Sequence, residues 1–76
     1  MNKDLKTKTF NPKVSIIILS YNQAEYIKEA ISSALNQTYT NLEIIISDNG
    51  STDSTKQIIK SFLDDDRMIF LDYKEN

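Results

Sequence analysis

The chain has 76 residues, of which 39 % are hydrophobic and 26 % charged, and its formal net charge is −2. This composition is typical of a small soluble globular chain and excludes disordered and fibrous classes. The negative charge disfavours non-specific nucleic-acid binding, which requires a basic surface. The sequence has neither cysteine nor histidine, which excludes disulfides, thiolate zinc sites and imidazole metal ligands.

Residues 1–11 form a polar lead, and the pattern of a folded domain begins at residue 12. The lead has no apolar core of the kind that a signal peptide needs. The longest apolar run, 16–19, is far shorter than the about 20 residues that span a bilayer. We therefore expect a soluble, cytoplasmic chain.

Two hydrophobic patterns alternate after the lead. Continuous β-branched and apolar runs predict strands over 14–19, 42–47 and 68–71. Apolar residues at helical spacing predict helices from 24 to about 37 and from 53 to 63. The buried face of the second helix is expected to contain Ile58, Ile59, Phe62 and Leu63. The β-α-β-α-β order predicts parallel strands, as in half of a doubly wound, Rossmann-like α/β sheet.

The first two predicted strands are apolar on both of their faces. Two successive right-handed crossovers place both helices on one face of the sheet. Strands that are apolar throughout are normally covered on both sides. We therefore expect an incomplete sheet whose second face is covered by the rest of a larger domain, or by a partner chain through self-association.

Polar loops follow the first two strands, at 20–23 and 48–51. Ligands of open parallel sheets bind beyond the carboxyl ends of the strands. Both loops lead into predicted helices, whose first N–H groups lack partners within the helix. We therefore expect the two loops to open onto one crevice with free N–H donors.

Three residues of these loops have the chemistry of a nucleotide site, and two of them have a structural alternative. The ring of Tyr21 can stack on a nucleobase or cover the end of a strand. The Asp48 carboxylate can accept hydrogen bonds from ribose or from a base N–H, or it can stabilise a turn before Gly50. The Asn49 amide offers a donor and an acceptor, which suits the edge of a pyrimidine.

The remaining loop residues are typical of turns and helix caps. Asn22 is predicted to cap the first helix, with Glu25 completing a capping box. Gly50 is predicted to supply a positive φ. Ser51 and Asp53 are predicted to act as helix caps.

Two acidic features are not assigned to a site. Asp64 and Asp66 have D-x-D spacing, but they follow a helix C-terminus, where the dipole disfavours anions. They also lie at the edge of the sheet opposite the expected crevice, so we predict a solvated turn. Asp72 follows the third strand alone. The glycine motifs of dinucleotide sites and P-loops are absent, which disfavours both kinds of nucleotide site. No metal ligand or catalytic residue is assigned to the sequence.

Three segments at linked spacing resemble the start of family 2 glycosyltransferases, which have the GT-A fold. They are 13–22 (KVSIIILSYN), 31–39 (ISSALNQTY) and 42–53 (LEIIISDNGSTD). The resemblance covers residues 12–76. It implies that this region is the N-terminal nucleotide-binding part of a glycosyltransferase domain.

The resemblance also implies a reaction and its binding residues. The reaction is transfer of a sugar from a nucleotide-diphosphate donor to a saccharide, lipid-linked or other acceptor, with inversion. The residues implied to bind the nucleotide are Leu19, Ser20, Tyr21, Asn22, Asp48 and Asn49. The amide at Asn49 replaces a second carboxylate, so uridine, thymidine and guanosine donors all remain open.

In the family, the metal-binding D-x-D motif and the catalytic base lie downstream of these segments. The resemblance therefore implies Mg²⁺ or Mn²⁺ for the parent enzyme, with ligands outside this chain, and allows a parent at the membrane periphery. We expect the 76-residue chain to be inactive alone. The alternatives are a non-catalytic nucleotide-binding or assembly module of the same fold, and an unrelated doubly wound domain.

Overall fold

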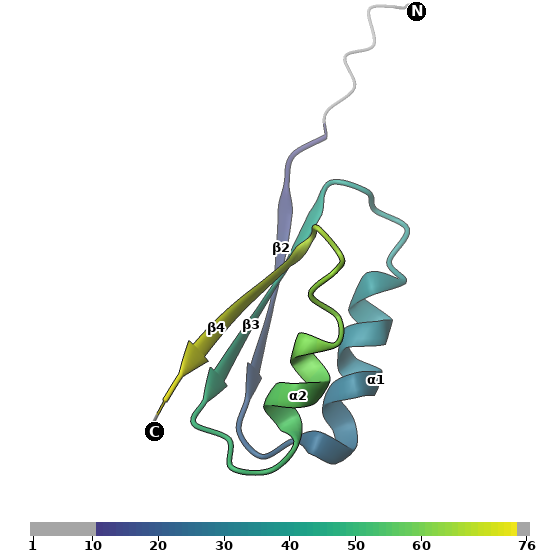
Figure 1. The fold of residues 1–76 in the computed structure, drawn as a ribbon. Helices are drawn as coiled ribbons and strands as arrows, with labels where there is room; N and C mark the ends of the chain where they lie inside the picture. Colours follow the sequence, from purple (N-terminus) through teal and green to yellow (C-terminus); the bar gives the residue numbers. More distant parts are fainter. Residues whose placement is uncertain (1–10, 75–76) are drawn as a thin grey trace, which may run out of the picture.

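A computed structural model describes residues 11–74 of the chain (Figure 1). All but the last residue of the predicted polar lead therefore lies outside the described residues. The elements are β2 (Val14–Ser20), α1 (Ala24–Leu35), β3 (Leu42–Asn49), α2 (Thr55–Lys60) and β4 (Met68–Tyr73). The predicted β-α-β-α-β order is confirmed.

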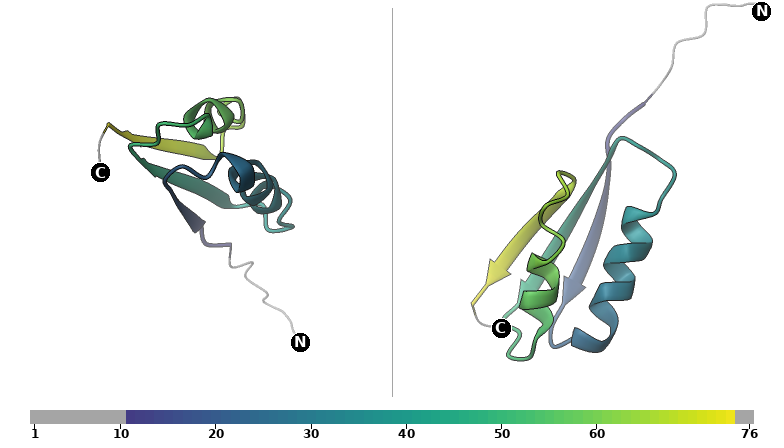
Figure 2. Two further views of the ribbon diagram at one scale, coloured as in Figure 1. Left: turned by 90° about the horizontal axis from the view of Figure 1, so that it is seen from below. Right: turned by 45° about the vertical axis from the view of Figure 1, so that its right-hand side comes forward.

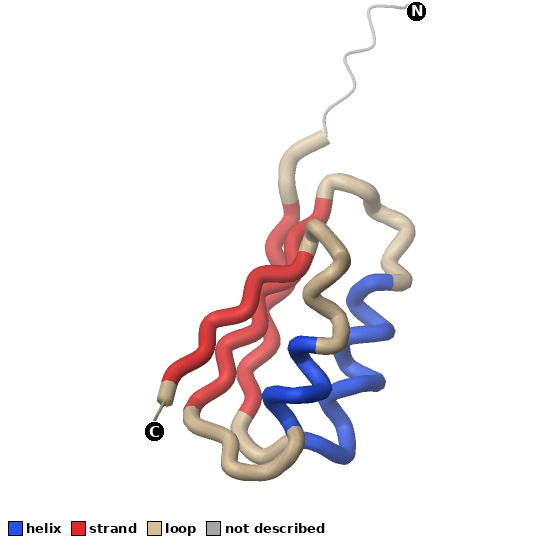
Figure 3. The backbone as a smooth tube through the Cα atoms, in the orientation of Figure 1, coloured by secondary structure: helices blue, strands red, loops and turns tan. Residues whose placement is uncertain are grey.

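The three strands form one parallel sheet in the order β2-β3-β4 (Figure 3). The register places Ser20 opposite Asp48, and Asp48 opposite Asp72. All three strands therefore end at the same edge of the sheet. This is the Rossmann-like half-sheet that the alternating pattern predicts.

Both helices cover the same face of the sheet (Figure 2). Alternate residues of the central strand point at them, because side chains along a strand alternate between the two faces. The buried hydrophobic core joins β3 and β4 to α1 and α2 and consists of Ile27, Ile31, Ala34, Leu42, Ile44, Ile46, Ile59 and Met68.

Among the described residues, no helix lies over the opposite face of the sheet, which carries apolar side chains. Ile17 is 64 % exposed and Leu19 is 77 % exposed, and Ile69 and Leu71 on β4 are exposed as well. The predicted uncovered face is therefore present. Within residues 11–74, no helix has the length and hydropathy that crossing a membrane requires.

The second helix is shorter than predicted, and the burial predicted for Leu63 is wrong. After Lys60, the N–H groups of Phe62 and Leu63 donate to carbonyls three residues back, those of Ile59 and Lys60, at 3.0 and 3.2 Å. Such bonds tighten the chain relative to an α-helix, which changes the direction of the last side chains. Ile58 and Phe62 still pack against the core, whereas Leu63 is 39 % exposed.

The acidic turn after α2 is held by an ion pair. Arg67 Nη2 lies 2.8 Å from Asp65 Oδ2, and Arg67 Nη1 donates to the carbonyl of Leu35 at the end of α1. The hydrogen bonds from Arg67 lower the pKa of Asp65 to about 2. Asp64 and Asp66 are exposed in this turn, at the edge of the sheet opposite the strand ends.

Truncation on the two faces of the sheet should differ in cost. Ile46→Ala removes a fully buried side chain and is expected to lower the free energy of unfolding by about 2–5 kcal/mol. Ile17→Ala, the matched control on the uncovered face, is expected to change it by about 0.5 kcal/mol. Urea unfolding followed by circular dichroism measures both. Equal losses would contradict a sheet covered on one face only.

The Asp65–Arg67 pair should make unfolding sensitive to acid. Because the folded pKa of Asp65, about 2, lies below the ordinary value of about 3.9, the pair stabilises the fold above pH 4. That contribution is lost as the pH falls toward 2. Asp65→Asn should therefore lose less stability over this range, measured as urea midpoints against pH. Asp64→Asn removes the same charge from the same turn and should follow the unmodified chain.

Candidate functional site

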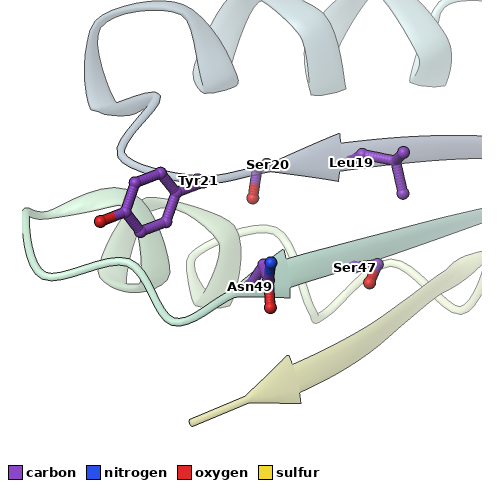
Figure 4. Close-up of a pocket in the computed structure, with 5 residues that line it drawn as sticks. All are labelled: Leu19, Ser20, Tyr21, Ser47 and Asn49. Atoms are coloured by element: carbon purple, nitrogen blue, oxygen red, sulfur yellow. The ribbon is translucent and has the colours of Figure 1, made fainter. Parts of the chain in front are cut away.

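A hollow of about 320 Å³ lies at the carboxyl ends of β2 and β3 (Figure 4). Its volume falls within the range of small-molecule sites, about 300–1,000 Å³. The residues that line it are Leu19, Ser20, Tyr21, Ser47 and Asn49. The structure thus brings the ends of the first two strands together at one hollow, as the topology predicts.

The alternation of side chains along the strands decides which residues face the hollow. Leu19 and Asn49 are exposed, whereas Asp48 is buried toward the helices. Ser20 also borders the hollow, but it is only 5 % exposed and its hydroxyl donates to Asp48. Tyr21 continues beyond the end of β2 and is 45 % exposed. Its ring and the Asn49 side chain therefore lie at the ends of adjacent strands (Figure 4).

Asp48 is fully buried behind the hollow. Its Oδ1 accepts hydrogen bonds from Ser20 Oγ at 2.6 Å and from Ser51 Oγ at 2.5 Å, and its Oδ2 accepts from Ser51 N at 3.0 Å. Burial raises the pKa of Asp48, but these hydrogen bonds and the charge of Lys56 lower it below its ordinary value. The carboxylate is therefore ionised at neutral pH and already joined to both loops.

The predicted role of Asn22 as the cap of α1 is wrong. The N-cap position belongs to Gln23, and Asn22 has a φ of 51°. Asparagine tolerates this left-handed conformation, which directs the side chain to the neighbouring loop. There its Oδ1 accepts from the N–H groups of Thr52 and Asp53 at 2.8 and 3.3 Å.

The loop after β3 in turn caps the start of α1. Asp53 Oδ2 accepts from Ala24 N at 3.3 Å, and Thr55 Oγ1 accepts from Gln23 N at 2.9 Å. Asp53 Oδ1 accepts from Thr55 N at 2.9 Å and also from the Thr55 hydroxyl. The hydrogen bond from the Thr55 side chain lowers the pKa of Asp53.

Asp53 is not the N-cap of α2, a position that belongs to Ser54, although its carboxylate accepts from N–H groups at the starts of both helices. The bonds of the two loops also correct two other predictions. Ser51 is not a helix cap, because its Oγ donates to Asp48 and accepts from Asn22 N at 2.8 Å. The N–H donors expected to be free at the helix starts are already partnered at residues 22–24, 52, 53 and 55. Gly50 has the predicted positive φ, 80°.

Asp72 does not stand alone as its position in the sequence predicts, but pairs with a residue of α2. Its Oδ1 lies 2.7 Å from Lys56 Nζ, and the hydrogen bond from Lys56 lowers the pKa of Asp72. Residues 11–74 contain no group of three potential metal ligands. Because Asp48, Asp53 and Asp72 are bonded to serine, threonine and lysine, these carboxylates do not fit a divalent metal ion.

Three residues that the structure places in or behind the site were not singled out from sequence. Ser47 shares a strand face with Asn49, two positions on, and this spacing could have identified it. Thr55 is a fully buried polar residue in α2, and its D-x-T spacing from Asp53 was the available signal. The contact of Lys56 with Asp72 spans 16 positions and leaves no local pattern.

Sequence and structure comparisons both match this chain to glycosyltransferases. The model of the glycosyl transferase family 2 matches residues 15–76. Uncharacterised glycosyltransferases of Rickettsia typhi and Rickettsia prowazekii are each 50 % identical over 72 residues, which cover 95 % of this chain and 22 % of each relative. The chain thus spans between a fifth and a quarter of the length of these relatives.

A solved structure shares the fold. The mannosyltransferase of Pyrobaculum calidifontis, in complex with GDP-Man and Mn²⁺, matches with a TM-score of 0.80 and 27 % identity. The match covers 90 % of this chain and 21 % of the mannosyltransferase. The half-sheet is therefore that of a GT-A glycosyltransferase, and the chain belongs to glycosyl transferase family 2.

Proposed function

We propose that this chain supplies the nucleoside side of the donor site of a glycosyltransferase. The parent enzyme transfers a sugar from a nucleotide-diphosphate donor to a saccharide, lipid-linked or other acceptor, with inversion. Relatives that are named glycosyltransferases favour this function over a non-catalytic module of the same fold.

The proposal rests on one observation: the side chains of Tyr21 and Asn49 line the same hollow (Figure 4). An aromatic ring stacks on any nucleobase. A carboxamide beside it can donate to and accept from the edge of the base or the ribose hydroxyls. The hollow lies at the carboxyl ends of two parallel strands, the edge at which α/β sheets bind ligands.

The other predicted site residues divide into two roles in this proposal. Leu19 and Ser20 line the hollow with Ser47 and contact the nucleoside through its base or ribose. Asp48 and Asn22 hold the ligand-facing residues in position, because their side-chain oxygens already accept hydrogen bonds from the two loops.

The diphosphate, the metal ion and the chemistry belong to other parts of the parent enzyme. The complex of the mannosyltransferase with GDP-Man and Mn²⁺ supports a nucleotide-sugar donor and a divalent metal for the parent. The carboxylates of residues 11–74 do not fit that metal, so no step of the transfer is assigned to them. Inverting transfer also needs a base that deprotonates the acceptor.

Calorimetry with GDP, UDP and dTDP tests the donor site. At least one nucleotide should bind, and Tyr21→Ala should weaken it by the about 1–3 kcal/mol that base stacking contributes. Asn49→Ala should weaken binding about tenfold, which corresponds to one hydrogen bond. Tyr26→Ala removes the same type of side chain from α1, where it is also exposed, at 62 % against 45 % for Tyr21, and is the control. If the folded chain binds none of the nucleotides, the proposal fails.

The isolated chain should bind donor without transferring sugar. Incubation of the purified 76-residue chain with GDP-mannose or UDP-glucose, Mn²⁺ and a mixture of saccharide acceptors should yield no glycosylated product by mass spectrometry. The reason is that the described residues provide no assigned base or metal ligand. Detectable transfer would show that the catalytic groups are present in this chain.

A further inference from the structure

Hydrogen bonds join the loops that follow β2 and β3, next to the ligand-facing residues Tyr21 and Asn49. We propose that Thr55, a residue outside the hollow, is a positioning residue of the nucleotide site, because its hydroxyl joins these loops. This inference rests on the proposed function. The interloop network comprises residues 22–24, from the first loop and the start of α1, and Ser51, Thr52, Asp53 and Thr55, from the second loop and the start of α2.

The network begins next to the side chains that face the hollow. Asn22 directly follows Tyr21, and both its N–H and its Oδ1 bond to the second loop. Ser51 lies two residues beyond Asn49 and accepts the Asn22 N–H at 2.8 Å. The backbone that follows Tyr21 is therefore hydrogen-bonded to the segment that follows Asn49.

Thr55 joins the two loops farther from the hollow, through Gln23 and Asp53. Its Oγ1 accepts from Gln23 N at 2.9 Å and donates to Asp53 Oδ1. Asp53 in turn accepts from Ala24 N at 3.3 Å. One hydroxyl thus orients the carboxylate that holds the first loop and also binds that loop directly.

Thr55 acts on the nucleotide only through these loops. It is fully buried and is not among the residues that line the hollow. A change in nucleotide affinity after substitution at this position therefore reports the placement of Tyr21 and Asn49. Holding binding groups in place before the ligand arrives raises affinity by reducing the ordering that binding requires.

Two substitutions at residue 55 separate positioning from packing. Thr55→Val keeps the shape of the side chain but removes the hydroxyl and both of its hydrogen bonds. It should weaken nucleotide binding about tenfold, because binding must then order the loosened loops. Amide hydrogen exchange of Gln23 should become faster. Thr55→Ser keeps the hydroxyl and should restore both affinity and protection.

A stability control separates loop placement from a general loss of folding. Ile31→Val truncates a fully buried core residue of α1 that lies outside the network. It should lower the melting temperature while leaving the nucleotide dissociation constant unchanged. If Ile31→Val weakens binding as much as Thr55→Val does, the effect is one of stability and the proposal is overturned.

A second position keeps the test open if Thr55→Val does not fold. Asn22→Gly retains the positive φ at an exposed residue but removes the oxygen that binds Thr52 and Asp53, so exchange at these two amides should accelerate and binding should weaken. Asn22→Asp keeps an acceptor and should restore both.

The outcomes distinguish this inference from the proposed function. If the unmodified chain binds no nucleotide, the proposed function fails and this inference fails with it. If the unmodified chain binds and the affinities of Thr55→Val and Asn22→Gly match it, the nucleotide site stands and only the positioning role is overturned.

Discussion

The structure depends on an exchange of hydrogen bonds between its two polar loops. The first N–H groups of a helix have no partner inside the helix. Within residues 11–74, neither Gln23 nor Ser54, the N-cap positions of α1 and α2, makes a side-chain cap. Asn22 instead bonds to the chain before α2, while Asp53 and Thr55 bond to the start of α1. The start of α1 therefore depends on residues at the start of α2, while the loop before α2 is held by Asn22 and the first N–H of α2 is bonded by its own Asp53. The two loops act as one unit.

In the proposed site, the alternation of side chains along β3 separates a supporting residue from a residue that faces the hollow, at the same edge of the sheet. Asp48 points to the helices and binds Ser20 and Ser51. Asn49, the next residue, points to the hollow that it shares with Tyr21. A buried, ionised and fully bonded carboxylate keeps the strand ends in register, while the adjacent amide remains exposed to a ligand. This division suits a chain whose core lies on one face of a three-stranded sheet.

Features that depend on neighbouring residues could be predicted from the sequence. The β-branched runs and the helical stripe gave the elements and their parallel order, and the turn at Gly50 has the predicted positive φ. The cap of α1 could not be predicted in this way. Local preferences favoured Asn22 and Glu25, but the bonds that replace them join residues about thirty positions apart. The exposure of Leu63 could not be predicted for a related reason, because only the folded chain shows that α2 tightens after Lys60.

The central claim is that Tyr21 and Asn49 bind one nucleotide from the ends of adjacent strands. Nuclear Overhauser contacts measured by NMR between the chain and bound GDP or UDP test it most directly. The account predicts contacts from the base protons to the Tyr21 ring, and from base or ribose protons to the Asn49 side-chain amide, in the same complex. Contacts confined to the apolar face around Ile17 and Ile69, or to the turn at Asp64 and Asp66, would contradict it.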